Sequence, residues 1–327
     1  MKIIECVPNF SEGRDKYTIA AIKNSIEKTE NVKLLNLESD EDYNRTVATF
    51  IGDEKSIVEA AVNCSTEAAK RINMRFQRGV HPRLGAVDVV PFIPIKNISM
   101  EECVKISRVF AGIISQKLNI PVFLYEESAG SKKRKNLSEI RSGEYEGLQE
   151  KIKLKAWRPD YGEPDFNPKT GALVTGARFF LIAYNVNLNT NNLSITRKIA
   201  GAVRESGMYS TDEKARVPGL LKNVKAIGVY LSKYNICQVS MNLTNYKITP
   251  VYEAFESVKT EAAKYDIEVT GSEIVGMIPE EALLDTAKFY FEKETDKNEL
   301  LNLTINKLGL NSLNEFKISG KIIGNSY

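Results

Sequence analysis

A single histidine, His81, is the residue in this sequence best suited to move protons at neutral pH. Imidazole has an unperturbed pKa of about 6.5, so it both accepts and donates a proton near neutrality. Because the 327 residues include one histidine, a zinc site built from several histidines, such as HExxH, is excluded. Any imidazole chemistry in this chain therefore depends on His81.

The segment GVHPRLGAVDVVPFIP, residues 79–94, gives His81 an unusual setting. Its glycines permit uncommon backbone angles or the close approach of a ligand, and the proline after the histidine restricts the backbone. Arg83 carries a guanidinium that can hold a carboxylate with two hydrogen bonds. A histidine on such a loop is typical of a catalytic group, but a capped structural histidine would give the same pattern. Both interpretations remain open.

A second polar cluster lies in ESDEDYNRTVATFIG, between two expected strands. Its polar residues are Glu38, Asp40, Asp42, Asn44 and Arg45. One interpretation is a polar hairpin tip held by side chains that bond to nearby backbone groups. The other is a binding site for a ligand that carries both a cation and a carboxylate.

Three further segments combine polar groups with loop-forming residues. Residues 7–14, VPNFSEGR, either contact substrate or cap the next helix. In residues 162–171, Phe166 could stack on a flat heterocycle and Lys169 could bind a carboxylate. Residues 217–228, VPGLLKNVKAIG, lack Walker spacing, so no P-loop is predicted there.

Composition excludes several classes of protein. The net charge of +3 is too small to favour nucleic-acid binding, and 43% hydrophobic with 27% charged residues is ordinary for a soluble globular chain. Because there is no apolar run of about 18–20 residues, neither a signal peptide nor a membrane span is expected. The four cysteines have no CxxC spacing, which suits a reducing compartment and predicts a cytoplasmic protein without a metal site.

The hydrophobic pattern predicts an α+β protein of two domains, since single cores rarely exceed about 250–300 residues. Helical spacing predicts helices at 17–28, 54–72, 99–119, 194–206, after Thr249 and at 279–291. Apolar runs predict strands at 2–7, 32–37, 45–51, 86–93, 122–125, 179–188, 224–231, 237–243 and 267–270. The regular pattern breaks down over residues 136–170, and the segment WRPDYGEPDFNPKTG, residues 157–171, is expected to form an ordered loop. The element order indicates two ferredoxin-like (split β-α-β) subdomains, residues 1–177 and 178–327, with a ligand cleft between them.

Several long and unusual stretches resemble one family. They are ECVPNFSEGR, NRTVATFIG, HPRLGAVDVVPFIP, RSGEYEGL, GALVTGARFFLIAYNVNL, QVSMNLTNY and GSEIVGMIPEEALLDTAKFY, colinear from Ile4 to about Leu310. In these stretches the chain is similar to the glutamate formiminotransferases, both the stand-alone bacterial form and the first domain of animal formiminotransferase-cyclodeaminase. No counterpart of the helical cyclodeaminase domain is seen before Tyr327.

The resemblance implies a set of site residues. The family's catalytic histidine corresponds to His81, and Glu38 and Asp40 are joint candidates for an assisting carboxylate. Asn44, Arg45 and Arg83 are candidates for binding the substrate. The folate-contacting stretches correspond to Gly162, Glu163, Pro164, Asp165, Phe166, Asn167, Pro168, Lys169, Thr170 and Gly171, and to Gly219, Leu220, Leu221, Lys222, Asn223, Val224, Lys225, Ala226, Ile227 and Gly228.

The same resemblance implies the reaction. The formimino group of N-formimino-L-glutamate would pass to N5 of tetrahydrofolate, a co-substrate, in histidine degradation, with no metal. Two alternatives stay open: formyl transfer from N-formylglutamate, and folate binding without turnover. The expected partners are these small molecules, a second copy in a homodimer and a separate cyclodeaminase, with neither nucleic acid nor membrane.

Overall fold

A computed structural model describes residues 2–323 except 42, 80, 211–213 and 292–295. The chain divides into two compact units, Met1–Phe179 and Phe180–Tyr327. This division lies close to the boundary expected after residue 177. Within the described residues, no helix is long and apolar enough to cross a membrane.

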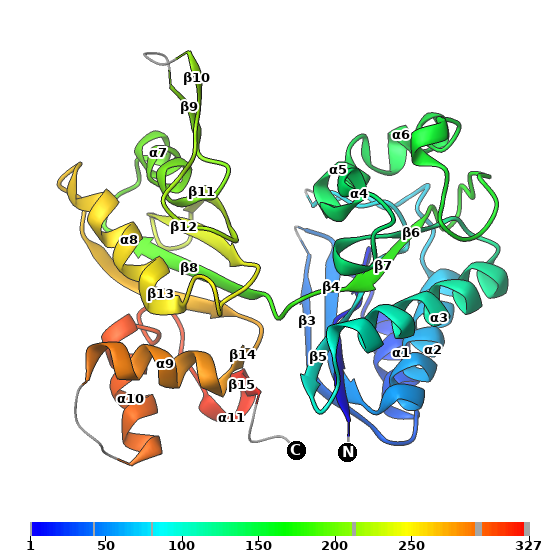
Figure 1. The fold of residues 1–327 in the computed structure, drawn as a ribbon, viewed down its shortest axis with the longest axis horizontal. Helices are drawn as coiled ribbons and strands as arrows, with labels where there is room; N and C mark the ends of the chain where they lie inside the picture. The colour runs from blue at the N-terminus through cyan, green and yellow to red at the C-terminus, as the bar shows by residue number, and fades with distance from the viewer. Residues whose placement is uncertain (1, 42, 80, 211–213, 292–295, 324–327) are drawn as a thin grey trace. The chain divides into compact units, whose positions relative to one another are not determined.

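The first unit is built on a seven-stranded sheet covered by helices (Figure 1). Its main elements are β1 (Ile3–Cys6), β2 (Asn9–Phe10), α1 (Lys16–Glu27), β3 (Val32–Asp40), β4 (Arg45–Gly52), α2 (Glu54–Arg71), β5 (Val87–Lys96), α3 (Met100–Leu118), β6 (Val122–Leu124) and β7 (Leu173–Ala177). Strand β1 lies between β4 and β5, β3 is outside β4, and these four strands pair antiparallel. Beyond β5, β7 and then β6 extend the sheet with parallel pairing.

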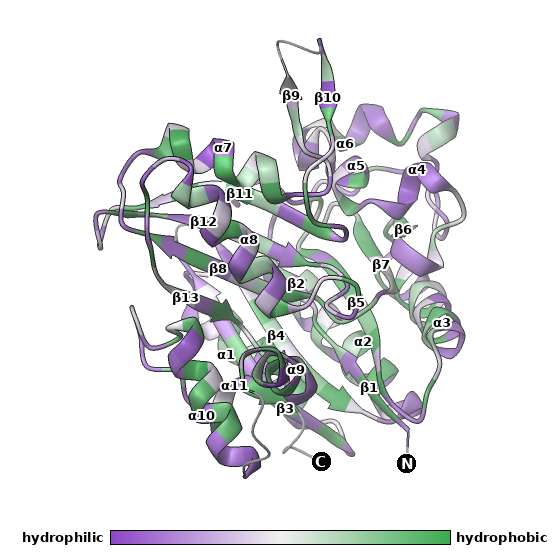
Figure 2. Cartoon of the chain, turned by 60° about the vertical axis from the view of Figure 1, so that its left-hand side comes forward, coloured by the Kyte–Doolittle hydropathy of each residue, from purple (hydrophilic) through white to green (hydrophobic). Residues whose placement is uncertain are grey.

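Helices α1, α2 and α3 each begin directly after a residue whose side chain caps the first turn. Asp53 caps α2, and Ser99 forms with Glu102 the capping box expected for α3. The apolar stripes of the three helices pack into one core with alternate residues of β1, β4 and β5. Figure 2 shows this as hydrophobic colour along β5 and on α2. This packing fixes the strands β2, β3, β4 and β5, whose connecting loops carry the polar residues of the site.

The loop expected at residues 157–171 is present from residue 158, but residues 136–157, where no regular pattern was seen, contain short helices. After η1 (Glu126–Ser128) and α4 (Lys132–Lys135), the segment contains α5 (Leu137–Arg141), α6 (Glu144–Lys151) and η2 (Lys155–Trp157). Ile140, Leu148 and Trp157 bury their side chains in a small core against β6 and β7. Burial therefore stabilises helices that are too short and polar to be recognised by periodicity. Strand β7 was also not predicted.

The second unit repeats the strand order of the first unit's antiparallel strands. Its elements are β8 (Ile182–Leu188), α7 (Leu193–Val203), β11 (Val224–Leu231), β12 (Ile236–Leu243), α8 (Val251–Ala263) and β13 (Val269–Val275). Strand β8 lies between β12 and β13, β11 is outside β12, and all pairs are antiparallel. Helices α7 and α8 share a core with one face of this sheet.

Several further elements of the second unit were not predicted. They are the hairpin of β9 (Met208–Ser210) and β10 (Ala215–Val217), then β14 (Ile278–Pro279), α10 (Lys297–Leu308), α11 (Ile318–Lys321) and β15 (Ile322–Ile323). The helix expected at 279–291 is present as α9 (Glu280–Tyr290). Two predicted ends are wrong: Pro250, not Thr249, is the N-cap of α8, and α7 ends at Val203 rather than at residue 206.

All four cysteines are free and buried: Cys6, Cys64, Cys103 and Cys237. Burial raises the pKa of Cys64 and of Cys103 to about 12 and raises the pKa of Cys6 well above its usual range. These thiols therefore act as small apolar packing groups.

Candidate functional site

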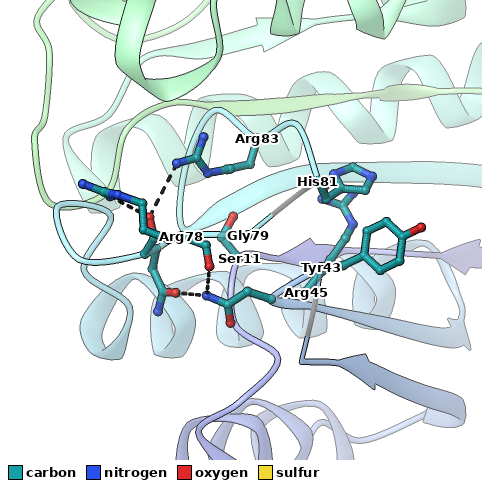
Figure 3. Close-up of a pocket in the computed structure, with 9 residues that line it drawn as sticks. Ser11, Tyr43, Arg45, Arg78, Gly79, His81 and Arg83 are labelled. Carbon is teal, nitrogen blue, oxygen red and sulfur yellow. Dashed lines mark hydrogen bonds between the residues drawn. The ribbon is translucent and has the colours of Figure 1, made fainter. Parts of the chain in front are cut away.

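His81 lines a small, solvent-open pocket in the first unit. Three loops supply the walls: the one after β2, the β3–β4 turn and residues 77–83. Figure 3 shows His81 beside Tyr43, with Arg83 on another side of the pocket. The lining residues are Ser11, Tyr43, Asn44, Arg45, Gln77, Arg78, Gly79, His81 and Arg83.

Asn44 holds these loops together. Its backbone is left-handed, with φ of 49°, a conformation that asparagine tolerates better than most residues. Its side-chain oxygen accepts from the Gly13 amide at 2.9 Å, and its Nδ2 donates to the Arg78 carbonyl at 3.0 Å. At Gly79 a Cβ would lie 2.3 Å from the Tyr43 carbonyl oxygen, so only glycine allows the loops this close. Asn44 is thus an organiser of the pocket.

A buried ion pair lies beneath the histidine. Asp88, in β5, is fully buried and accepts from Arg45 Nη1 at 2.9 Å. Arg141, at the end of α5, also pairs with Asp88. Asn9 Oδ1 takes two further hydrogen bonds from Arg45, at 2.8 and 3.1 Å. Burial alone would raise the pKa of Asp88, but the two arginines outweigh it and lower that pKa to about 2.

The Nδ1 atom of His81 has two neighbours with opposite demands. The Pro82 carbonyl oxygen, 2.7 Å away, needs a donor, whereas Arg45 Nη1, 3.1 Å away, needs an acceptor. One ring nitrogen cannot meet both needs. The shorter carbonyl contact favours a proton on Nδ1, because Arg45 is already bonded to Asn9 and Asp88. This tautomer leaves the lone pair on Nε2.

The charge around the ring keeps it neutral. Partial burial, Arg45 and Arg141 lower the pKa of His81 to about 4, although Asp88 acts in the opposite direction. At neutral pH His81 is therefore a base with a free Nε2 lone pair. It becomes a proton donor only after it has taken a proton.

Arg83 is already bonded to protein carboxylates. Its Nη1 donates to Glu144 at 2.8 Å and its Nη2 to Glu146 at 2.7 Å, both on α6. Arg83 is buried while the two glutamates are largely exposed. These bonds attach the histidine loop to α6 and engage both terminal nitrogens of the guanidinium.

Glu38 and Asp40 lie at the end of β3, and both are exposed. Asp40 Oδ1 accepts from the Tyr43 amide at 2.7 Å, which closes the β3–β4 turn. Glu38 accepts from Asn36 at 3.0 Å. Neither is among the described residues that line the pocket, and Asp42 lies outside the described part.

Residues 162–171 pack against the histidine loop rather than standing free. Thr170 and Gly171 pair with Gly85 and Ala86, and the Lys169 carbonyl accepts from the Met74 amide at 2.8 Å. The Phe166 ring lies 5.4 Å from the ring of Tyr145. Glu163, Pro164 and Asp165 are exposed, so the outer half of this segment is the accessible part.

In residues 219–228 of the second unit, a turn leads into β11, which begins at Val224. Leu221, Val224 and Ala226 are core residues, while Leu220, Lys222 and Ile227 are exposed. Gly228 lies against α7, where a Cβ would be 2.8 Å from the Arg197 amide. Only the exposed residues of this segment are accessible to a ligand.

The two halves of the chain each match a family model. The N-terminal subdomain of the formiminotransferase domain matches residues 3–178, and the model described as formiminotransferase domain matches residues 183–326. The chain belongs to the formiminotransferase domain family. The resemblance seen in the sequence motifs is thereby confirmed.

Relatives of two lengths share this domain. The glutamate formimidoyltransferase of Streptococcus pyogenes is 44% identical over 90% of this chain and 94% of its own length. The glutamate formimidoyltransferase of Thermoplasma acidophilum is 45% identical over 89% of this chain and 93% of its own length. The formimidoyltransferase-cyclodeaminase of Dictyostelium discoideum is 46% identical over 98% of this chain. This chain spans 60% of the length of that relative.

Sequence reasoning about this formiminotransferase domain missed Asp88 and Arg141. A signal was present, because Asp88 is the one charge inside the apolar run AVDVVPFIP, and a buried charge needs a partner. The identity of that partner depends on the fold. No group of three or more histidine, cysteine, aspartate or glutamate side chains suited to a metal occurs among the described residues.

Because the chain has a single histidine, the pKa of His81 can be measured without overlap from other imidazole signals. The imidazole Cε1–H signal in NMR is expected to titrate with a pKa of about 4 in the folded protein. The folded chain then binds fewer protons than the unfolded chain between pH about 4 and about 6.5, so stability is lost as pH falls through that window. An Arg141→Gln variant is expected to raise the pKa, because a positive charge is removed. A native pKa near 6.5 would contradict the described environment.

Proposed function

We propose that this chain transfers the formimino group of N-formimino-L-glutamate to N5 of tetrahydrofolate, giving 5-formiminotetrahydrofolate and L-glutamate. The observation that supports this most is the neutral His81 in a pocket of a chain that covers 94% of the Streptococcus pyogenes glutamate formimidoyltransferase. We take His81 as the catalytic residue.

The proton transfers follow from the tautomer of His81. The N5 lone pair attacks the amidinium carbon and gives a tetrahedral carbon that bears three nitrogens. Nε2 of His81 takes the proton from N5 and then donates it to the glutamate nitrogen, whose bond to carbon breaks with the electron pair going to nitrogen. A positioned acid–base group contributes about 10²–10⁴-fold in rate, and orientation of the two substrates adds up to about 7–11 kcal/mol.

Arg78 is the pocket cation best suited to a carboxylate of formiminoglutamate. It is exposed, and among the described residues its side chain donates only to the carbonyl oxygens of Arg75 and Gln77. Arg45, by contrast, is buried and bonded to Asn9 and Asp88, and Arg83 is bonded to two glutamates. We assign Arg45 to orienting His81 and Arg83 to holding the loop. A bound carboxylate would also raise the pKa of His81 and make it a stronger base.

The strand order supports a finer description of the fold. In both units a first strand lies between the third and fourth strands of a β-α-β-β-α-β unit, which is the arrangement of ferredoxin-like folds. We therefore propose two ferredoxin-like subdomains, 1–177 with the catalytic histidine and 178–327. The ligand cleft expected between them stays a prediction, as do the homodimer, the cytoplasmic location and the separate cyclodeaminase.

The proposed reaction has a direct test. Purified protein is mixed with tetrahydrofolate and formiminoglutamate, and acid then converts the product to the methenyl chromophore. We expect turnover that persists in a chelator and is much faster than with N-formylglutamate. Faster turnover with N-formylglutamate would favour the formyl-donor alternative. Binding of tetrahydrofolate without turnover of either donor would favour a folate-binding protein.

A further inference from the structure

Lys151, the last residue of α6, donates from its ammonium to three backbone carbonyls. The distances from Nζ are 2.8 Å to Glu139, 2.8 Å to Ile140 and 2.7 Å to Ser142. These carbonyls belong to the last residues of α5 and to the residue that follows it. The last carbonyls of a helix have no partner within it, and an ammonium has three protons to donate. Lys151 therefore supplies partners for the end of α5 from the neighbouring helix.

The aromatic ring of Trp157 covers the ammonium of Lys151. The Nζ atom lies 4.1 Å from the ring centroid, and the ring is buried in the same small core as Ile140. Burial lowers the pKa of Lys151 to about 8, with Lys133 acting in the same direction and Glu139 in the opposite one. At pH 7 the ammonium therefore keeps the three protons that the three carbonyls accept.

Arg141 lies between the carbonyls that Lys151 holds. Its side chain reaches the buried Asp88, where Nη2 pairs with Oδ2 and Nε lies 3.4 Å from Oδ1. Asp88 Oδ2 also accepts from Arg45 Nη1, which is 3.1 Å from His81 Nδ1. A short path of contacts therefore joins the end of α5 to the imidazole.

Helix α5 is too short to hold Arg141 in place by itself. It has five residues, and isolated helices shorter than about 12–15 residues are marginal in water. Asn136 caps its first turn, and Ile140 is its one buried residue. Figure 1 shows α5 grouped with the short helices α4 and α6. The position of Arg141 thus depends on Lys151, which bonds to carbonyls on both sides of it.

We propose that Lys151 is a positioning residue for proton transfer by His81. Its ammonium fixes the end of α5 so that Arg141 meets Asp88. The shared carboxylate in turn holds Arg45 against the imidazole. The catalytic meaning of this inference rests on the proposed function, to which it adds a residue that lies outside the pocket.

Lys151 acts on the imidazole through Arg141 rather than by its own charge. The largest electrostatic effects on the pKa of His81 come from Arg45 on β4, Arg141 on α5 and Asp88 on β5. Release of Arg141 from Asp88 removes a positive charge from the histidine and leaves the carboxylate less neutralised. Both changes favour the imidazolium, so both raise its pKa.

The test measures the pKa of His81 in the full chain without substrate, by NMR of the imidazole Cε1–H. Lys151→Met keeps an apolar stem against Trp157 but removes the three donors, and we expect the pKa to rise by roughly 0.5–1 pH unit. In an Arg141→Gln background the same substitution should add less than about 0.2 pH unit, because the path of contacts is already broken.

Lys133→Met is the matched control. Lys133 also lies over the Trp157 ring, 5.1 Å from its centroid, but it is exposed and donates to no carbonyl among the described residues. The substitution removes the same charge and should leave the pKa of His81 within about 0.2 pH unit of wild type. Fluorescence of Trp157, the one tryptophan in the chain, reports whether the variants keep this region folded.

A second variant guards against loss of folding. Lys151→Gln keeps two N–H donors, so it should raise the pKa of His81 in the same direction but by less. A wild-type pKa in folded Lys151→Met and Lys151→Gln would overturn the proposal. Equal rises in Lys151→Met and Lys133→Met would also overturn it, as would rises that add in full in the double variant with Arg141→Gln.

Activity decides the catalytic part separately. Because the imidazole is displaced, kcat of Lys151→Met for formimino transfer at pH 7 should fall roughly 3–10-fold, with the KM for tetrahydrofolate within twofold of wild type. A raised pKa with unchanged kcat would overturn the positioning role. If the wild-type chain transferred no formimino group, the proposed function would fail, while the NMR titrations would still decide whether Lys151 holds Arg141.

Discussion

Replacing His81 by alanine is expected to lower kcat for formimino transfer about 10²–10⁴-fold, the usual contribution of a positioned acid–base group. The affinity for tetrahydrofolate should stay within about twofold of wild type, because the imidazole acts on the proton of N5. Added imidazole should restore part of the activity, since the pocket is open at this position. The measurements are steady-state kinetics by the methenyl assay and tetrahydrofolate binding by calorimetry.

Tyr43→Phe provides the matched control for this variant. Tyr43 lies beside His81 with ring centroids 6.1 Å apart, and its side chain is 46% exposed. The substitution keeps the ring and removes a hydroxyl for which the proposed mechanism has no use, so kcat should change little. A His81→Ala enzyme with kcat within threefold of wild type would remove His81 from the catalytic role.

Replacing Asp88 by asparagine is expected to cause the largest loss of stability, about 3–5 kcal/mol in the free energy of unfolding. Asparagine keeps the shape, but it leaves Arg45 and Arg141 close together, poorly exposed and without their counter-charge. Urea unfolding at pH 7 measures the effect. The control, Asp285→Asn, breaks an exposed pair with Lys288 and should cost about 1 kcal/mol or less.

The Asp88→Asn substitution should also change the pKa of His81. Asp88 raises the pKa of the imidazole, so its neutralisation should lower that pKa further below 4. In the wild type the folded pKa of Asp88 is below its unfolded value. Its contribution to stability is therefore present above about pH 3.9 and is lost as pH falls through about 2. Equal urea midpoints for Asp88→Asn and Asp285→Asn would contradict the ion-pair account.

The long periodic elements of this fold were predictable because local sequence decides them. Helices α2 and α3 have strong apolar stripes and capping residues, and both begin where the sequence places them. Helices α5 and α6 have five and eight residues, and burial against β6 and β7 decides whether they form. Packing of that kind depends on strand order, which local patterns do not specify.

The candidate site was predictable from the sequence only where one residue is informative by its type alone. His81 was chosen as a candidate because its residue type and its loop are rare in this sequence, and it lines a pocket. Arg83 was expected to bind substrate, but its two carboxylate partners on α6 lie about sixty residues further along the chain. Likewise Asp88 pairs with arginines from β4 and α5. Such long-range pairs appear only once the sheet is assembled.

The burial of every cysteine has a practical consequence for experiments on this protein. Thiol-directed dyes and spin labels react with the exposed thiolate, and the native thiols here are shielded, three of them with a raised pKa. A cysteine introduced on the surface of each unit would therefore be labelled over a silent background. A pair of such labels would report the distance between the two units, and its change on ligand binding, without first removing any native residue.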